Sequence, residues 1–156
     1  MKTSTRKFDS VQQEAYLAIW RTYDRLRAIE EALFSEWNLS AQQYNVLRIL
    51  ESSNPDKIPT LSLTKRLISR APDITRMLDR LEQNDWIERE RSAEDRRTVL
   101  VGITTEGLRL LKELQRPLAQ CHQKQVGHLS VKELKKLCEL LSQAREPHES
   151  EDGFWK

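Results

Sequence analysis

The spacing of hydrophobic residues constrains this chain more than any other feature. Along most of the 156 residues they recur every three or four positions, the repeat of an amphipathic helix. The pattern changes once, at residues 87–103, where alternation of apolar and polar residues leads into a β-rich run. Only nine residues are glycine or proline, about half the usual share, which disfavours a many-stranded sandwich or barrel. We therefore predict a mainly α protein with a small β-hairpin.

Capping residues and prolines locate the expected helix ends. Ser10, Ser40 and Ser130 each precede a glutamine or glutamate by three positions, the signature of a capping box. Pro72 would lie in the first turn of a helix, and Pro117 should kink or end another. The segments predicted to be helical are residues 10–37, 40–51, 60–68, 71–84, 108–121 and 130–144.

Two short helices followed by a charged hairpin form the pattern of a winged helix-turn-helix. The hairpin would pair residues 87–91 with residues 98–103 around a polar tip. We predict a winged helix-turn-helix plus a helical dimerisation region. The expected division is 10–57 for N-terminal dimerisation and linking helices, 58–104 for the DNA-binding domain, 105–146 for C-terminal dimerisation helices and 147–156 for a frayed acidic tail.

The helix of residues 71–84 is the expected DNA-reading element, because its start would fit the major groove. Arg70 and Arg76 could each bond a guanine bidentately, and Thr75 could reach a phosphate or a thymine methyl group. Lys65 and Arg66, on the preceding helix, are placed for backbone phosphates.

Charge alone does not establish this role. Residues 62–80 contain five basic and two acidic side chains, but residues 60–100 contain nine and eight. A basic footprint therefore requires the helix start and the hairpin tip to lie apart from the carboxylates that follow the helix, which are Glu82, Asp85, Glu88 and Glu90. The alternative is an ordinary solvated surface of mixed charge.

Four segments in this order resemble the multiple-antibiotic-resistance repressor (MarR) family. They are residues 73–82 (DITRMLDRLE), 86–89 (WIER), 94–101 (EDRRTVLV) and 104–107 (TTEG). The resemblance implies a homodimeric winged-helix repressor of a palindromic operator, with its first and last two helices forming the dimer. It also implies that the Asp95-Arg96-Arg97 wing contacts DNA, with Arg97 directed toward the minor groove and Asp95 orienting the arginines.

One position departs from the family pattern. Relatives often carry small polar residues at the start of the recognition helix, where this chain has Asp73. A carboxylate facing phosphates would repel them, so we expect Asp73 to cap the helix or to accept a hydrogen bond from cytosine N4.

The dimer is also expected from the residues themselves. The first helix and the last two have broad apolar stripes, which a two-fold partner would cover most simply. Relatives often release DNA when a small aromatic acid binds between the dimer helices and the winged domain. The candidate ligand residues are Trp20, Tyr23, Trp37, Tyr44 and Arg48. Ordinary core packing is the alternative role of each aromatic residue.

Other chemistries are less well supported. Cys121 and Cys138 lie in phase with the apolar stripes, where cysteine usually packs as a small hydrophobe. A zinc site at Cys121, His122 and His128 is disfavoured because adjacent helical residues point apart. We find no catalytic motif, and we expect no enzyme activity, no cofactor and no metal.

The predicted function is that of a sequence-specific transcriptional regulator, a homodimeric repressor relieved by a small aromatic ligand. The net charge of only +2 leaves open a winged-helix module that binds protein instead of DNA. A redox-responsive regulator acting through Cys121 or Cys138 is the other alternative. No apolar run approaches the length of a bilayer span and residues 1–10 do not form a secretory signal, so a cytoplasmic protein with no membrane partner is expected.

Overall fold

The computed structural model describes residues 8–150, and its elements follow the predicted order with two additions, a short strand and a 3₁₀ turn. They are α1 (Val11–Ser35), α2 (Ala41–Ser53), β1 (Ile58–Pro59), α3 (Thr60–Arg66), α4 (Ile74–Gln83), β2 (Ile87–Arg91), β3 (Val99–Ile103), α5 (Thr105–Val126), α6 (Val131–Arg145) and a 3₁₀ turn (Glu146–His148). The helices α2 and α6 begin with the full capping boxes expected at Ser40 and Ser130. At Ser10 the box is one-sided, because the Gln13 side chain accepts instead from the backbone N–H of Asp9.

The three strands form one antiparallel sheet in the order β1-β3-β2. The pairs Ile87–Ile103 and Arg91–Val99 fix the register of the hairpin. The two-residue strand β1 was not predicted, since a run that short carries no periodicity. Its Pro59 lies in the edge strand, where the sheet does not require the backbone N–H that proline lacks.

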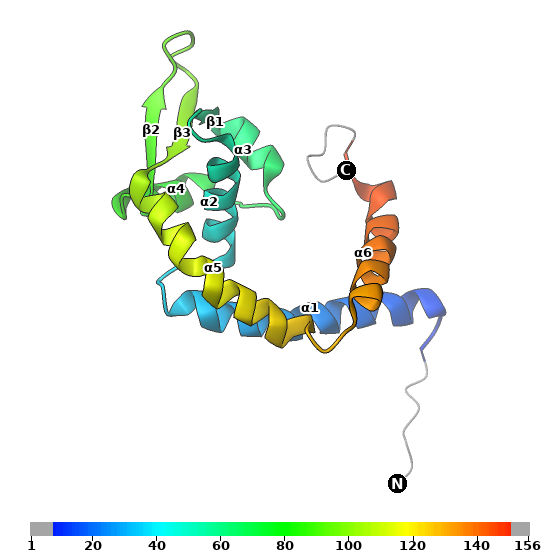
Figure 1. Ribbon diagram of the computed structural model, residues 1–156. Coiled ribbons are helices and arrows are strands. Elements are labelled where there is room, and N and C mark those ends of the chain that lie inside the picture. The colour runs from blue at the N-terminus through cyan, green and yellow to red at the C-terminus, as the bar shows by residue number, and fades with distance from the viewer. Residues whose placement is uncertain (1–7, 151–156) are drawn as a thin grey trace.

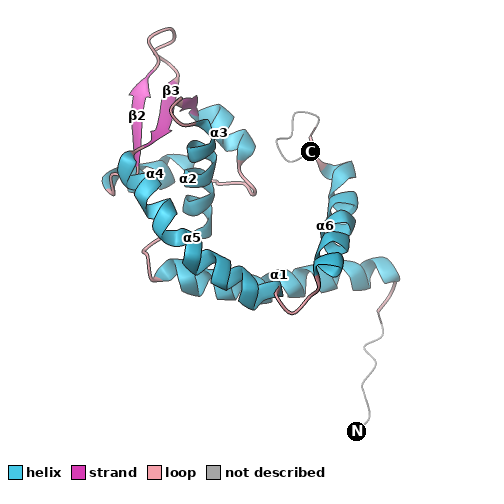
Figure 2. Ribbon diagram, viewed as in Figure 1, coloured by secondary structure: helices cyan, strands magenta, loops and turns pink. Residues whose placement is uncertain are grey.

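The molecule has a compact winged part and an extended helical part (Figure 1). Helices α2, α3 and α4 surround the root of the sheet, and the hairpin tip projects beyond them (Figure 2). Helices α1 and α5 lie side by side and lead away from the winged part, and α6 stands at their far end. This arrangement presents the hairpin and α4 at one end of the molecule.

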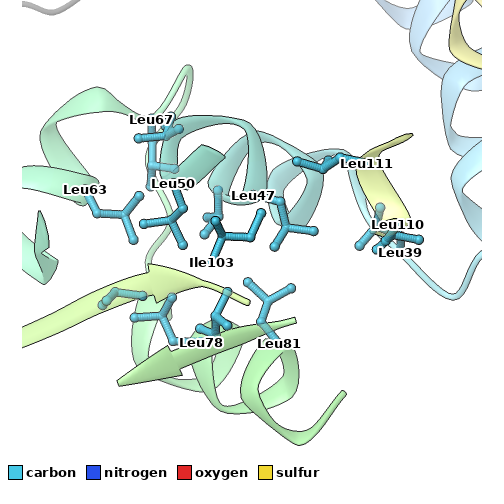
Figure 3. Close-up of a cluster of buried hydrophobic side chains, with 14 of the residues drawn as sticks. Leu39, Leu47, Leu50, Leu63, Leu67, Leu78, Leu81, Ile103, Leu110 and Leu111 are labelled. Carbon is cyan, nitrogen blue, oxygen red and sulfur yellow. The ribbon is translucent and has the colours of Figure 1, made fainter. Parts of the chain in front are cut away.

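The hydrophobic core is centred in the winged part and continues along α5 as far as Leu118 (Figure 3). Leu47 and Leu50 of α2 meet Leu63 of α3 and Leu78 and Leu81 of α4, and all five are at most 2% exposed. Helix α2 therefore shares a core with the segment 58–104, although we assigned it to the N-terminal helices. The domain division remains a prediction.

The expected place of Pro72 was wrong, and of the two outcomes expected at Pro117, a kink or a helix end, the structure excludes the helix end. Pro72 precedes α4 instead of lying in its first turn, because Asp73 takes the capping position. Pro117 does not end a helix, since α5 continues through it to Val126. Burial of Leu114, Leu118 and Cys121 along one face of α5 outweighs the hydrogen bond that the proline removes.

The ends of the chain lie partly beyond the described residues. The predicted frayed tail covers residues 147–156, of which 151–156 lie outside them, and the signal-sequence question concerns residues 1–10, of which 1–7 do. Among residues 8–150, no helix combines the length and the apolar character that a membrane span requires.

Candidate nucleic-acid interface

The start of α4 is organised by a single carboxylate. Asp73 accepts from the backbone N–H of Arg76 at 3.2 Å, which makes it the N-cap. Its other oxygen lies 3.2 Å from Arg76 Nε, in an exposed ion pair. Of the two roles expected for Asp73, the structure shows the capping role. The same contact directs the guanidinium of Arg76 along the exposed side of the helix start.

Hydrophobic spacing on α4 determines which side chains face outward. Leu78 and Leu81 are buried, and Ile74 and Met77 pack against the core at the edge of the same face. Thr75, Arg76 and Arg80 are exposed on the remaining surface. The helix therefore presents two arginines and a hydroxyl, the groups that bond guanine edges and phosphates.

The basic residues before α4 differ in their surroundings. Lys65 and Arg70 are exposed, and Arg70 lies in the loop that Gln42 of α2 holds through the Arg70 carbonyl at 3.3 Å. Arg66 is half-buried and donates to the Ser53 hydroxyl at 3.2 Å, which fastens α3 to α2. Lys65 and Arg70 thus lie on the surface, whereas Arg66 also has a structural role.

The hairpin tip is closed by a second aspartate. Asp95 accepts from the backbone N–H of Arg97 at 3.0 Å and from the Thr98 hydroxyl at 3.2 Å. Arg91 adds a bond of 2.8 Å to the carbonyl of Arg96. Asp95 therefore shapes the backbone of the tip, while the side chains of Arg96 and Arg97 are exposed. Within residues 8–150 no carboxylate forms an ion pair with either of them.

Most of the carboxylates that could offset the positive charge of the helix start and hairpin tip form ion pairs with other cations. Arg89 on β2 bonds Asp79 and Glu82 of α4, each at 2.6 Å. Lys57 lies 3.1 Å from Glu88 and 2.8 Å from Glu90. The hydrogen bond to Glu82 is the main cause that raises the pKa of Arg89. The hydrogen bond to Glu90 is the main cause that raises the pKa of Lys57. Three of the four carboxylates in question, Glu82, Glu88 and Glu90, are thus paired with cations other than the arginines of the helix start and the hairpin tip.

The segment 104–107 joins the hairpin to α5. The Thr104 hydroxyl caps α5 by accepting from Gly107 N–H at 3.0 Å, and it also donates to the carbonyl of Asp85. Asp85 itself has a φ of 59°, which turns the chain from α4 into β2. A Cβ at Gly107 would lie 2.3 Å from the carbonyl oxygen of Trp86. This segment therefore fixes the root of the wing.

Comparison with known proteins places these features in a family. The model of the MarR family matches residues 39–99. The helix-turn-helix transcriptional regulator YpoP of Bacillus subtilis is 33% identical to this chain over 118 residues. These residues are 73% of this chain and 78% of YpoP. The chain belongs to the MarR family.

Solved structures agree with this assignment. A MarR transcription factor from Planctomyces limnophilus is 52% identical, with a TM-score of 0.70 over 88% of this chain and 99% of that one. A mutant MarR from E. coli, solved in complex with operator DNA, is 26% identical with a TM-score of 0.75 over 87% of this chain and 99% of that one. As a MarR-family member, the protein is a winged-helix, DNA-binding transcription regulator and not an enzyme.

The residues predicted to bind a ligand are not gathered into one cavity. Trp20 and Tyr23 of α1 are about 60% exposed, and Trp20 lines a shallow hollow beside Arg21. Tyr44 is half-buried, with its ring centroid 5.1 Å from that of Phe34, and burial raises its pKa. Trp37 is half-buried against the core, and Arg48 is paired with Glu51 at 2.6 Å. A second hollow, which the sequence did not indicate, separates the start of α2 from α4.

The two cysteines have different environments. Cys121 is buried between α5 and α1, and burial raises the pKa of its thiol, which lowers its reactivity. Cys138 is exposed on α6. Within residues 8–150 no three His, Cys, Asp or Glu side chains are grouped so that they could hold a metal ion.

Proposed function

We propose that this MarR-family protein is a homodimeric repressor that binds a palindromic operator through Lys65, Arg66, Arg70, Asp73, Thr75, Arg76, Asp95, Arg96 and Arg97. Arg76 and Thr75 would read base edges, Lys65 and Arg70 would bond phosphates, and Arg97 would reach the minor groove. The observation that carries the DNA surface is the exposure of these basic side chains other than Arg66, together with the engagement of nearby carboxylates in the sequence by Arg89 and Lys57. DNA binding in turn favours the cytoplasmic location expected from the sequence.

The apolar surface of the helical part supports the dimer. Within residues 8–150 no residue of α6 is buried, and Leu137, Leu140 and Leu141 are 36–50% exposed. The first half of α1 likewise exposes Ile19 and Trp20. Surfaces of this kind, contiguous and apolar, are typical of protein interfaces. A two-fold partner would place two α4 helices on successive turns of one DNA face.

The dimer is tested by sedimentation at micromolar concentration. We expect about twice the chain mass of 18.4 kDa. Replacing Leu137 with Glu should dissociate or unfold the protein, because it places a charge in the apolar stripe of α6. The matched control is Ser142→Glu, which adds the same charge on the opposite side of the helix. A folded monomer that still binds DNA with wild-type affinity would contradict the dimer.

The operator is tested by selecting duplexes from a random DNA pool. A symmetric dimer should recover inverted repeats whose half-sites are about one helical turn apart. Recovery of single, asymmetric sites would contradict the proposed symmetry.

We further propose that a small aromatic acid relieves repression. The support is the pair Tyr44 and Arg48, which lie one helical turn apart on α2. A ligand carboxylate could share the guanidinium of Arg48 with Glu51 or take it from Glu51. By linkage such a ligand lowers DNA affinity only if it binds the DNA-incompetent arrangement more tightly.

A further inference from the structure

The strand β2 carries a cation cluster on each of its faces. On one face, Arg89 bonds Asp79 and Glu82 of α4 with three hydrogen bonds of 2.6–3.1 Å. The Arg89 side chain is 22% exposed, and its planar fork spans two carboxylates one helical turn apart. This cluster fastens the wing directly to the recognition helix.

On the other face, Lys57, the residue just before the edge strand β1, reaches across the sheet. Gly102 lies opposite Glu88 in the ladder, and a Cβ there would lie 2.7 Å from Lys57 Cγ. The absence of a side chain at Gly102 lets the stem of Lys57 pass over β3 and place its ammonium between Glu88 and Glu90. This second cluster fastens β2 to the chain segment that precedes α3.

We propose that Arg89 and Lys57 are positioning residues for DNA binding, which hold the wing at a fixed angle to α4 so that Arg97 and Arg76 meet the duplex together. The inference rests on the proposed DNA surface. A two-stranded hairpin is only marginally ordered by itself, and ordering it upon binding would cost affinity. Both cations are engaged by carboxylates, so neither is placed to neutralise a phosphate.

This role differs from a simple contribution to stability. Partly exposed ion pairs contribute little to the free energy of unfolding, because solvent screens them. Arg89→Met and Lys57→Met should therefore melt close to the wild type while the position of the wing relative to α4 becomes less defined. The expected loss is one of DNA affinity, and it should depend on the wing arginines.

The test is a double-mutant cycle read by fluorescence titration with a duplex selected from a random pool. Arg89→Met should weaken binding about tenfold in the wild-type background and less than twofold when Arg96 and Arg97 are both alanine. Lys57→Met should follow the same pattern with a smaller effect. Arg109→Met, which removes an exposed cation paired with Glu106 within α5, is the matched control and should leave affinity unchanged.

Two outcomes would overturn the inference. The first is an equal fold-loss in both backgrounds, or no loss at all, which would separate Arg89 from the wing. The second comes from the triple variant Arg89→Met/Asp79→Asn/Glu82→Gln, in which no carboxylate is left unpaired. Full recovery of affinity would assign the loss to repulsion of phosphates instead of to positioning, whereas continued weakness supports positioning.

The design also separates this inference from the proposed function. If the wild-type protein binds no duplex, the proposed DNA-binding surface itself is contradicted. If the wild type binds DNA but Arg89→Met weakens binding by the same factor with and without the wing arginines, only the positioning role is contradicted. If Arg89→Met does not fold, Arg89→Lys keeps the charge but loses the bidentate fork, and the cycle is run with that variant and Lys57→Met.

Discussion

Replacing Gly107 with alanine should destabilise the protein through one backbone contact. Gly107 lies in the first turn of α5 with ordinary helical geometry, so space and not backbone strain requires glycine there. An added Cβ would lie 2.3 Å from the carbonyl oxygen of Trp86 and 2.7 Å from Ile103 Cγ1. Since a carbon and an oxygen in contact are usually about 3.3 Å apart, α5 would have to move about 1 Å away from the Trp86 carbonyl.

The size of the effect can be estimated from these contacts. Forced overpacking costs about 1–3 kcal/mol. Displacing α5 would also lengthen the bond from Thr104 N–H to the Trp86 carbonyl, 3.1 Å in the structure, and the one from the Thr104 hydroxyl to Asp85. Each contributes about 1 kcal/mol. The better helix propensity of alanine offsets up to about 1 kcal/mol. We expect a net loss of about 2–4 kcal/mol, or roughly 5–15 °C in Tm.

Urea and thermal unfolding followed by circular dichroism measure this loss. The matched control is Gly102→Ala, where the obstructing atom belongs to the Lys57 side chain, which can rotate away. That variant should lose about 1 kcal/mol or less. Equal stability of the two variants, or a Gly107→Ala protein as stable as the wild type, would refute the argument from the Trp86 carbonyl.

Two other predictions concern recognition and regulation. Arg76→Ala should lower the ratio of specific to non-specific DNA affinity in titrations with a selected and a mixed-sequence duplex, because base contacts specify and phosphate contacts position. An equal fall with both duplexes would reduce Arg76 to a phosphate contact. Salicylate, as a simple aromatic acid, should quench tryptophan fluorescence, raise Tm and release the selected duplex, and Arg48→Ala should weaken all three responses without weakening DNA binding. Full release from the Arg48→Ala protein would mean that another cation holds the carboxylate.

Local sequence patterns predicted most of the helices and the hairpin. Ser40 and Ser130 mark helix starts because a capping box is a contact between residues three apart. The place of Pro72 and the continuation of α5 through Pro117 could not be predicted, because both depend on competing interactions. Asp73 takes the N-cap position of α4, which leaves Pro72 outside the helix. In α5, burial of one face outweighs the backbone hydrogen bond that Pro117 removes.

The parts of the site that depend on distant contacts could not be predicted. Lys57 and Glu90 are 33 positions apart, and only the register of β1 and β2 on β3 brings them together. Arg89 was noted as part of a family motif, but its bonds to α4 follow from the turn at Asp85. The aromatic residues of α1 were identified by type, but Trp20 and Tyr23 are about 60% exposed, and in the proposed dimer a second chain would cover them.

The salt dependence of DNA binding by Arg97→Ala tests the central claim most directly, since that claim assigns the wing to the DNA interface. Arg97 is exposed, so its loss should change the free energy of unfolding by no more than about 0.5 kcal/mol. Affinity for selected and mixed duplexes should fall together by about 1–3 kcal/mol, and the slope of log K against log salt should become shallower by about 0.9, as expected when one cation is lost from the DNA interface. A variant with wild-type affinity and slope would contradict the account.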